Sequence, residues 1–197
     1  MLDLHRNRFK GVENKIADIF AGLPLAPNHY TSLSIAFALA ALYSMAAAEY
    51  FLALLLFAVA AFLDLIDGAV ARKKGLATKR GAYWDTIADR YVEAIFLFGL
   101  LFCGLPDFYL SAAAWIFLAL FGSTMTTYAK AAAKEKGLCD AELKGGLMSR
   151  GERLMVYFAI IILLSINLDW AVVILAALAI LSNFTALQRI YDALKSG

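Results

Sequence analysis

Four aspartates stand in two pairs at helical spacing, and they have the clearest capacity for chemistry in this chain: Asp64, Asp67, Asp85 and Asp89. The first pair lies late in one apolar run, and the second lies at the start of the next. At about 100° per residue, each pair occupies one face of its helix, within an arc of about 80–100°. Gly68 shares the first face and Gly81 shares the second. If the two faces meet, four carboxylates converge.

Carboxylates that converge in this way repel one another, and bound divalent cations would relieve the repulsion. Mg²⁺ and Mn²⁺ prefer oxygen ligands, and Mg²⁺ commonly binds substrate phosphates as well. Two such ions suit a displacement at phosphorus, because they stabilise both the entering and the leaving oxygen. Gly68 and Gly81 let a phosphate or a nucleotide approach the helix backbone. The basic run Arg72, Lys73 and Lys74 can neutralise phosphate charge.

A second interpretation of the same aspartates is a proton or ion relay in a small transporter. Ionisable residues within membrane helices serve that purpose widely. The sequence contains no inverted repeat and no Gly/Pro-broken helix at mid-membrane, features that transporters often show. On the aspartates alone, an enzyme and an ion-coupled transporter both stay open.

The composition excludes several classes of protein. The chain has 197 residues, of which 62% are hydrophobic and 17% are charged, against about 45–50% and about 25% in soluble domains. A disordered chain and an ordinary soluble globule are therefore excluded. The net charge is only +2, so we expect no nucleic-acid partner. A bilayer-embedded protein remains.

Six apolar runs are long enough to cross about 30 Å of hydrocarbon as helices. They are residues 31–48, 50–71, 86–105, 109–130, 153–168 and 170–190. Before them, residues 1–20 combine charges with apolar residues at helical spacing, which predicts an amphipathic helix on the membrane surface. We expect an all-α, polytopic membrane protein with six transmembrane helices, forming a single domain over 1–197.

The distribution of charge predicts how these spans are oriented. All 18 Lys and Arg residues fall in the N-terminal segment, in the loops after the second and fourth spans with their adjoining helix ends, and at the C-terminus. The opposite side carries only Glu49, Asp107 and Asp169. By the positive-inside rule, both termini face the cytoplasm. We expect a multi-pass protein of the cytoplasmic membrane whose active site lies at the cytoplasmic face.

The aspartates also belong to a longer motif, which reads Asp64-x2-Asp67-Gly68-x2-Ala71-Arg72-x8-Gly81-x3-Asp85-x3-Asp89. In every fixed position and spacing, this motif resembles the signature of the CDP-alcohol phosphotransferase family. The six-span layout, the N-terminal amphipathic helix and the Pro27-Asn28 step before the first span are also similar to that family. The resemblance covers essentially the whole chain.

The resemblance implies a transferase of substituted phosphate groups, which moves such a group from a CDP-linked alcohol to a hydroxyl of a second alcohol and releases CMP. It implies that the four aspartates hold two Mg²⁺ or Mn²⁺ ions. Asp89 would also be the general base, a role that a carboxylate within hydrogen-bond reach can fill. The CDP site would be lined by Gly68, Ala71, Arg72, Thr78 and Gly81. The family usually forms homodimers through its membrane helices.

Three short motifs resemble archaetidylinositol phosphate synthases and bacterial phosphatidylinositol phosphate synthases. They are Tyr128-Ala129-Lys130, Arg150-Gly151-Glu152-Arg153-Leu154 and Thr185-Ala186-Leu187-Gln188-Arg189. The resemblance implies an inositol phosphate acceptor, bound through its phosphate by Lys130, Arg150 and Arg189, joined by Arg153. Arginine suits a bidentate phosphate contact.

The expected reaction is therefore the Mg²⁺-dependent transfer of a phosphatidyl or archaetidyl group from CDP-diacylglycerol or CDP-archaeol to an inositol phosphate. Glycerol phosphate, serine or another alcohol stays open as the acceptor. The lipid tails also stay open, because helices that face either kind of tail are simply apolar.

Overall fold

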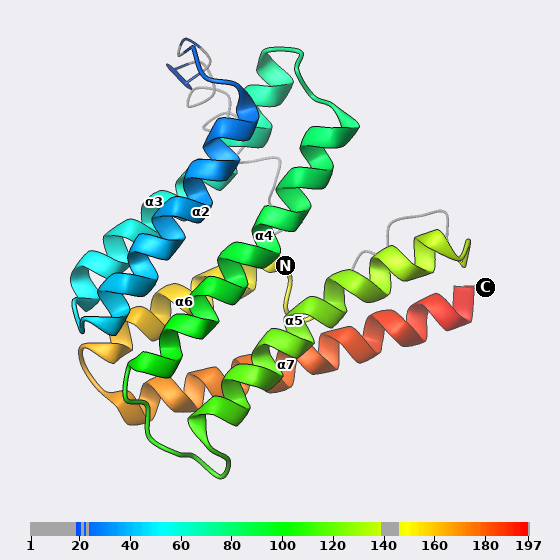
Figure 1. The fold of residues 1–197 in the computed structure, drawn as a ribbon. Coiled ribbons are helices and arrows are strands. Elements are labelled where there is room, and N and C mark those ends of the chain that lie inside the picture. The colour runs from blue at the N-terminus through cyan, green and yellow to red at the C-terminus, as the bar shows by residue number, and fades with distance from the viewer. Residues whose placement is uncertain (1–18, 21, 23, 139–145, 197) are drawn as a thin grey trace. The chain divides into compact units, whose positions relative to one another are not determined.

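The computed structural model describes residues 19–20, 22, 24–138 and 146–196 of the chain. Apart from an isolated bridge between Phe108 and Leu110, the regular structure of these residues is helical, which confirms the expected all-α class. The chain divides into two compact units, Met1–Phe96 and Leu97–Gly197. Figure 1 shows the helices of both units.

The first unit is built on an antiparallel hairpin of α2 (Pro27–Ala46) and α3 (Tyr50–Lys73), seen side by side in Figure 1. Pro27 begins α2, a position where the N–H that proline lacks would make no helical hydrogen bond. The residues buried along the hairpin are mostly small, and they include Ala38, Ala41, Ala53 and Ala60. Small side chains let two helix backbones approach closely, as is common among membrane helices.

The C-terminus of α3 is closed by a hydrogen-bonded turn of backbone groups. Gly75 has a φ of 65°, and the N–H of Leu76 donates to the carbonyl of Ala71 at 2.9 Å. The N–H of Gly75 donates to the carbonyl of Arg72 at 3.3 Å. These two bonds make a Schellman motif, which uses the tolerance of glycine for positive φ. The chain therefore reverses immediately after the charged end of α3.

The next helix, α4 (Lys79–Gly99), begins directly after this turn and belongs to the first unit as far as Phe96. Thr78 caps it, because its Oγ1 accepts a hydrogen bond from the N–H of Gly81 at 3.0 Å. A threonine in this position satisfies one of the unpaired donors at a helix N-terminus. The polar residues between Lys79 and Asp85 are therefore helical, although they lie before the apolar run that predicted a span from residue 86.

The second unit contains the short 3₁₀ helix η2 (Leu100–Phe102) and the helices α5 (Ala112–Glu135), α6 (Arg150–Leu164) and α7 (Leu168–Ser196). Helices α5 and α7 lie side by side and run in the same direction (Figure 1). Asn183 of α7 ties them together, since its Nδ2 donates to the carbonyls of Leu118 and Ala179, each at 2.8 Å. Gly122 makes room for this contact on α5.

Three of the described helices, α3, α5 and α7, are long and apolar enough to cross a membrane. They also expose large apolar side chains, among them Phe51, Leu55 and Leu65 on α3 and Phe184 and Leu187 on α7. Exposed apolar surface of this extent marks a face that meets lipid or another protein. The apolar helices therefore indicate an integral membrane protein.

Two finer expectations about the architecture stay predictions. Each of the six expected spans lies mainly on one helix, but α6 has only 15 residues, fewer than the ~20 that a crossing requires. The predicted interfacial helix over 1–20 falls outside the described residues, except for Ile19 and Phe20. Within the first unit, Phe20 packs against the buried cluster of Tyr30, Leu63, Ile66 and Val70, and its carbonyl accepts a hydrogen bond from the Tyr30 hydroxyl at 3.1 Å.

Candidate functional site

Three of the four aspartates come together in the first unit. Asp64 and Asp67 lie on α3 and Asp85 lies on α4, and each offers a carboxylate oxygen within 4.8 Å of the others. The side chain of Asp67 is buried, with 4% of its surface exposed. An all-oxygen set at this spacing fits a hard divalent cation, which prefers carboxylate ligands. The expected meeting of the two helical faces is therefore observed for these three residues.

Thr31 of α2 fixes the most buried of these carboxylates. Its Oγ1 donates a hydrogen bond to Oδ2 of Asp67 at 2.5 Å, and Thr31 is itself 2% exposed. A buried carboxylate requires such partners, because burying polar groups without hydrogen bonds is costly. Thr31 thus orients a candidate metal ligand.

Replacing Thr31 with valine is expected to weaken the binding of a divalent cation about tenfold, since partners that orient metal ligands typically contribute that much. Valine keeps the shape of the side chain and removes only the hydroxyl. The measurement is a titration of the purified protein with Mn²⁺, monitored by electron paramagnetic resonance. Thr86→Val is the matched control, because the exposed Thr86 hydroxyl donates only within α4, to the Ala82 carbonyl at 2.9 Å. Equal Mn²⁺ affinity in both variants would contradict the role of Thr31.

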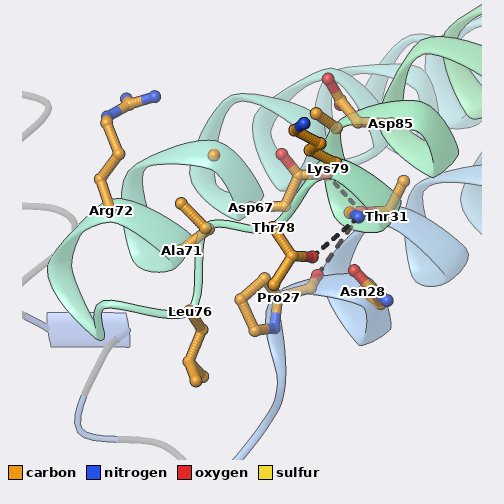
Figure 2. A pocket seen from close by; sticks show the side chains of 14 residues that line it. Pro27, Asn28, Thr31, Asp67, Ala71, Arg72, Leu76, Thr78, Lys79 and Asp85 are labelled. Atoms are coloured by element: carbon orange, nitrogen blue, oxygen red, sulfur yellow. Dashed lines mark hydrogen bonds between the residues drawn. The ribbon is translucent and has the colours of Figure 1, made fainter.

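A cavity of about 400 Å³ opens beside the carboxylate group. Its wall is formed by the start of α2, the end of α3, the turn after it and the first turns of α4 (Figure 2). All the residues that the sequence assigned to a CDP site line this cavity: Gly68, Ala71, Arg72, Thr78 and Gly81. Asp67 and Asp85 line it as well. Figure 2 shows Arg72 and Asp85 at opposite ends of the cavity, with Asp67 between them.

The backbone at Gly81 lies close to two polar side chains of the cavity. A Cβ atom at this position would lie 3.3 Å from Oγ1 of Thr78 and 3.5 Å from Oδ1 of Asn28. A larger side chain would therefore crowd the cavity at the point where α4 begins. The segment before α2 is held to the same region, because Nζ of Lys74 donates to the carbonyl of Leu25 at 2.9 Å.

The fourth aspartate, Asp89, lies one turn beyond Asp85 on α4, and its Oδ1 is buried. It is not part of the three-carboxylate group. Further along the same helix, Nη1 of Arg90 donates to Oε2 of Glu93, and Glu93 is 6% exposed. This ion pair compensates a buried carboxylate, which would otherwise be costly. The assignment of Asp89 as metal ligand and base stays a prediction.

The residues that the sequence assigned to the acceptor phosphate lie in the second unit: Lys130 on α5, Arg150 and Arg153 on α6, and Arg189 on α7. Arg150 is exposed, whereas Lys130 and Arg189 are half-buried. Arg153 is only 2% exposed. Nη1 of Arg189 donates to the carbonyl of Thr126 at 2.7 Å.

The sequence did not assign a role to Thr31 or Lys79, although both line the cavity. Thr31 lies one helical turn after Pro27, so the sequence does show a hydroxyl near the start of an apolar helix. Its partner Asp67 lies on another helix, and spacing within one chain segment does not reveal a contact of that kind.

The sequence matches a family model. This match agrees with the all-helical fold, the carboxylate group and the cavity lined by motif residues. The chain belongs to the CDP-alcohol phosphatidyltransferase family, whose model matches residues 24–184. It is therefore an enzyme of phospholipid biosynthesis and a transferase of substituted phosphate groups. Family membership thus decides between the enzyme and the transporter.

Two relatives are similar to this chain over most of their length. The chain is 33% identical over 201 residues to archaetidylinositol phosphate synthase of Pyrococcus horikoshii, covering 99% of this chain and 97% of the relative. It is 32% identical over 202 residues to phosphatidylinositol phosphate synthase of Corynebacterium glutamicum, covering 100% and 90% of the two chains.

Solved structures of a related enzyme have the same fold. The crystal structure of Mycobacterium tuberculosis phosphatidylinositol phosphate synthase with CDP-DAG bound matches with a TM-score of 0.78 and 26% identity, over 92% of this chain and 93% of that one. A second structure of that synthase, in complex with manganese and citrate, also has a TM-score of 0.78 and 26% identity, over 92% of this chain and 88% of that one.

Proposed function

We propose that this enzyme transfers a phosphatidyl or archaetidyl group from a CDP-lipid to the hydroxyl of an inositol phosphate and releases CMP. The observation that carries the proposal is the group of Asp64, Asp67 and Asp85 beside a cavity lined by the motif residues. The names of the relatives support the acceptor, because they are archaetidylinositol and phosphatidylinositol phosphate synthases.

In this proposal, Asp64, Asp67, Asp85 and Asp89 hold two Mg²⁺ or Mn²⁺ ions. When bound, such ions neutralise phosphate charge and stabilise the charge that develops at phosphorus. The oxygen-only donor set supports this choice of metals, and a related synthase is known in complex with manganese. Thr31 keeps the Asp67 carboxylate oriented by its hydrogen bond at 2.5 Å.

The CDP part of the donor occupies the cavity of about 400 Å³. Its size supports this assignment, since ligand sites usually enclose about 300–1,000 Å³. Gly68 and Gly81 let the nucleotide approach the helix backbone, and Ala71 contributes a small side chain to the cavity wall. Arg72 and Thr78 supply a cation and a hydroxyl at the rim. A neighbouring synthase has CDP-DAG bound, which fits a donor of this class.

The chemical step follows from these assignments. Asp89 takes the proton of the acceptor hydroxyl, as a carboxylate within hydrogen-bond reach can do. The acceptor oxygen then forms a bond to the lipid-proximal phosphorus. The bond from that phosphorus to the bridging oxygen of CMP breaks, and CMP leaves with the electron pair. Lys130, Arg150 and Arg189 hold the phosphate of the acceptor.

We also propose the finer architecture that the charge distribution predicts. Six spans, an interfacial helix over residues 1–20 and cytoplasmic termini place the active site at the cytoplasmic face of the cell membrane. The whole chain, 1–197, forms a single domain, and two copies associate as a homodimer. Exposed apolar residues such as Leu55 and Leu187 support a surface that meets lipid or another copy.

The experiment that tests the function measures CMP release by the purified protein with Mg²⁺ and a CDP-lipid. Inositol phosphate, glycerol phosphate and serine are supplied in separate reactions, and CDP-archaeol is compared with CDP-diacylglycerol. We expect release with inositol phosphate only. Release with glycerol phosphate or serine would keep the chemistry of the aspartates and overturn the acceptor.

A variant of Arg189 tests how the acceptor is bound. Arg189→Gln is expected to raise the KM for inositol phosphate about tenfold or more, because a charge-assisted phosphate contact is lost. The KM for the CDP-lipid should stay unchanged. Lys195→Gln is the control, since Lys195 is an exposed cation near the end of the same helix. Equal changes in both variants would indicate a general effect of charge on the membrane surface.

A further inference from the structure

A network of hydrogen bonds joins the three helices of the second unit next to the cationic residues. Thr126 of α5 is its centre, and it is fully buried. Its Oγ1 accepts a bond from Nη1 of Arg153 at 3.4 Å, and its carbonyl accepts one from Nη1 of Arg189 at 2.7 Å. The same Oγ1 donates to the carbonyl of Ser123 at 2.7 Å, which fixes the rotamer of Thr126.

The network also fastens the segment that leads into α6. The N–H of Met148 donates to Oγ1 of Thr185 at 3.1 Å, and its carbonyl accepts from Nη1 of Arg153 at 3.0 Å. Met148 is 5% exposed. Both backbone groups of one loop residue are therefore bound by side chains, one from α7 and one from α6. We call Thr126, Met148, Arg153 and Thr185 the polar bracket.

Close packing at Gly146 shows independently that this segment is pressed against α7. Gly146 has a φ of 113°, and a Cβ atom there would lie 2.3 Å from Cγ2 of Thr185. A Cβ atom here would force this methyl group to move, and the backbone conformation disfavours any residue other than glycine. The position of the segment relative to Thr185 is therefore fixed by packing as well as by the hydrogen bond.

The polar bracket stands immediately next to each residue of the proposed acceptor site. Lys130 follows Thr126 by one turn of α5, Arg189 follows Thr185 by one turn of α7, and Arg150 follows Met148 by two residues. We propose that the polar bracket positions these three cations relative to one another and so determines affinity for a phosphorylated acceptor. This inference deepens the proposed function and rests on it.

In this assignment, Arg153 is a positioning residue rather than a phosphate ligand. Its guanidinium is buried, and its Nη1 is bound to the Met148 carbonyl and the Thr126 hydroxyl. A guanidinium offers donors in a fixed, planar arrangement, so it holds the groups that it bonds at fixed directions. Displacing the groups that Arg153 bonds would displace the neighbouring cations and weaken their charge-assisted contacts with a phosphate.

The test compares Thr185→Val with Thr185→Ser in the full-length protein. Valine removes the acceptor of the Met148 N–H and keeps the Cγ2 methyl, whereas serine keeps the hydroxyl. We expect valine to raise the KM for inositol phosphate about tenfold, the effect of weakening one hydrogen bond to a charged group, with kcat and the KM for CDP-diacylglycerol unchanged. Serine should restore the acceptor KM. Thr124→Val, at an exposed position of α5, should behave as wild type.

An unchanged acceptor KM in folded Thr185→Val, or an equal rise in the KM for CDP-diacylglycerol, would overturn the proposal. If this variant does not fold, Thr126→Val takes its place, since it removes the hydroxyl partner of Arg153 and keeps the backbone carbonyl that binds Arg189. A several-fold rise in its acceptor KM is then expected, and no rise overturns the proposal.

The assay of CMP release by the wild-type enzyme tests the proposed function separately from the polar bracket. If the wild-type enzyme uses glycerol phosphate instead of inositol phosphate, the same comparison is made with glycerol phosphate, and a raised KM supports the polar bracket. If it uses only the unphosphorylated serine, the polar bracket is overturned together with the acceptor. Thermal stabilisation of wild type and Thr185→Val by inositol phosphate measures acceptor binding without turnover, and equal stabilisation contradicts the proposal.

Discussion

Asp85→Asn is expected to lower CMP release by about a hundredfold to a thousandfold, the usual cost of removing one preorganised electrostatic group from an active site. Asp85 offers a carboxylate oxygen within 4.8 Å of those of Asp64 and Asp67. Asparagine keeps the size of the side chain and removes its charge, so the protein should still fold. The rate is measured as CMP formed at saturating Mg²⁺ and CDP-lipid.

Two further measurements make this prediction specific to the carboxylate group. The Asp85→Asn protein should bind less Mn²⁺ than wild type in a direct titration, while its thermal unfolding stays unchanged. Asp169→Asn is the matched control, since Asp169 is an exposed carboxylate in the first turn of α7, and it should retain full activity. Full activity in Asp85→Asn would rule out the metal site.

Gly122→Ala is expected to destabilise the protein by about 1–3 kcal/mol, the usual cost of forcing extra atoms into a well-packed interior. A Cβ atom at Gly122 would lie 2.6 Å from Nδ2 of Asn183 and 2.7 Å from its backbone nitrogen. The backbone of α7 cannot rotate away as a side chain can. Moving the amide of Asn183 would also break its hydrogen bonds to Leu118 and Ala179, each 2.8 Å long.

Thermal unfolding of the purified protein in detergent measures this effect. The midpoint for Gly122→Ala should fall by several degrees, and helices α5 and α7 should become easier to cleave by protease. Ala113→Ser enlarges an exposed side chain near the start of α5 and should leave the midpoint unchanged. If Gly122→Ala unfolds at the same midpoint as wild type, α5 and α7 can move apart at Gly122 without loss of stability.

The apolar runs predicted where helices lie but not where they begin and end. Residues 50–71 correspond closely to α3 (Tyr50–Lys73), because that helix is apolar almost throughout. The span predicted from residue 86 begins after the true start of α4, which is Lys79. Hydropathy reports transfer into lipid, whereas a helix begins at the group that caps its N–H donors. Here that group is the Thr78 hydroxyl.

Helical periodicity was sufficient to place Asp64 and Asp67 on one face, and to expect Asp85 opposite them. The motif singled out Gly68 and Gly81, and both line the cavity of the first unit. The contacts that orient these residues were not predictable from spacing. Thr31 reaches Asp67 from another helix, and such contacts depend on how helices pack rather than on the period of any one helix.

The turn after α3 has a consequence for how tightly a ligand is held in the neighbouring cavity. Main-chain atoms alone form its two hydrogen bonds, from Gly75 and Leu76 to carbonyls of α3. Leu76 and the residues that follow it also line the cavity. The conformational entropy of ordering this wall is therefore lost when the protein folds, not when a ligand enters. Preorganisation of that kind raises affinity without adding a single contact.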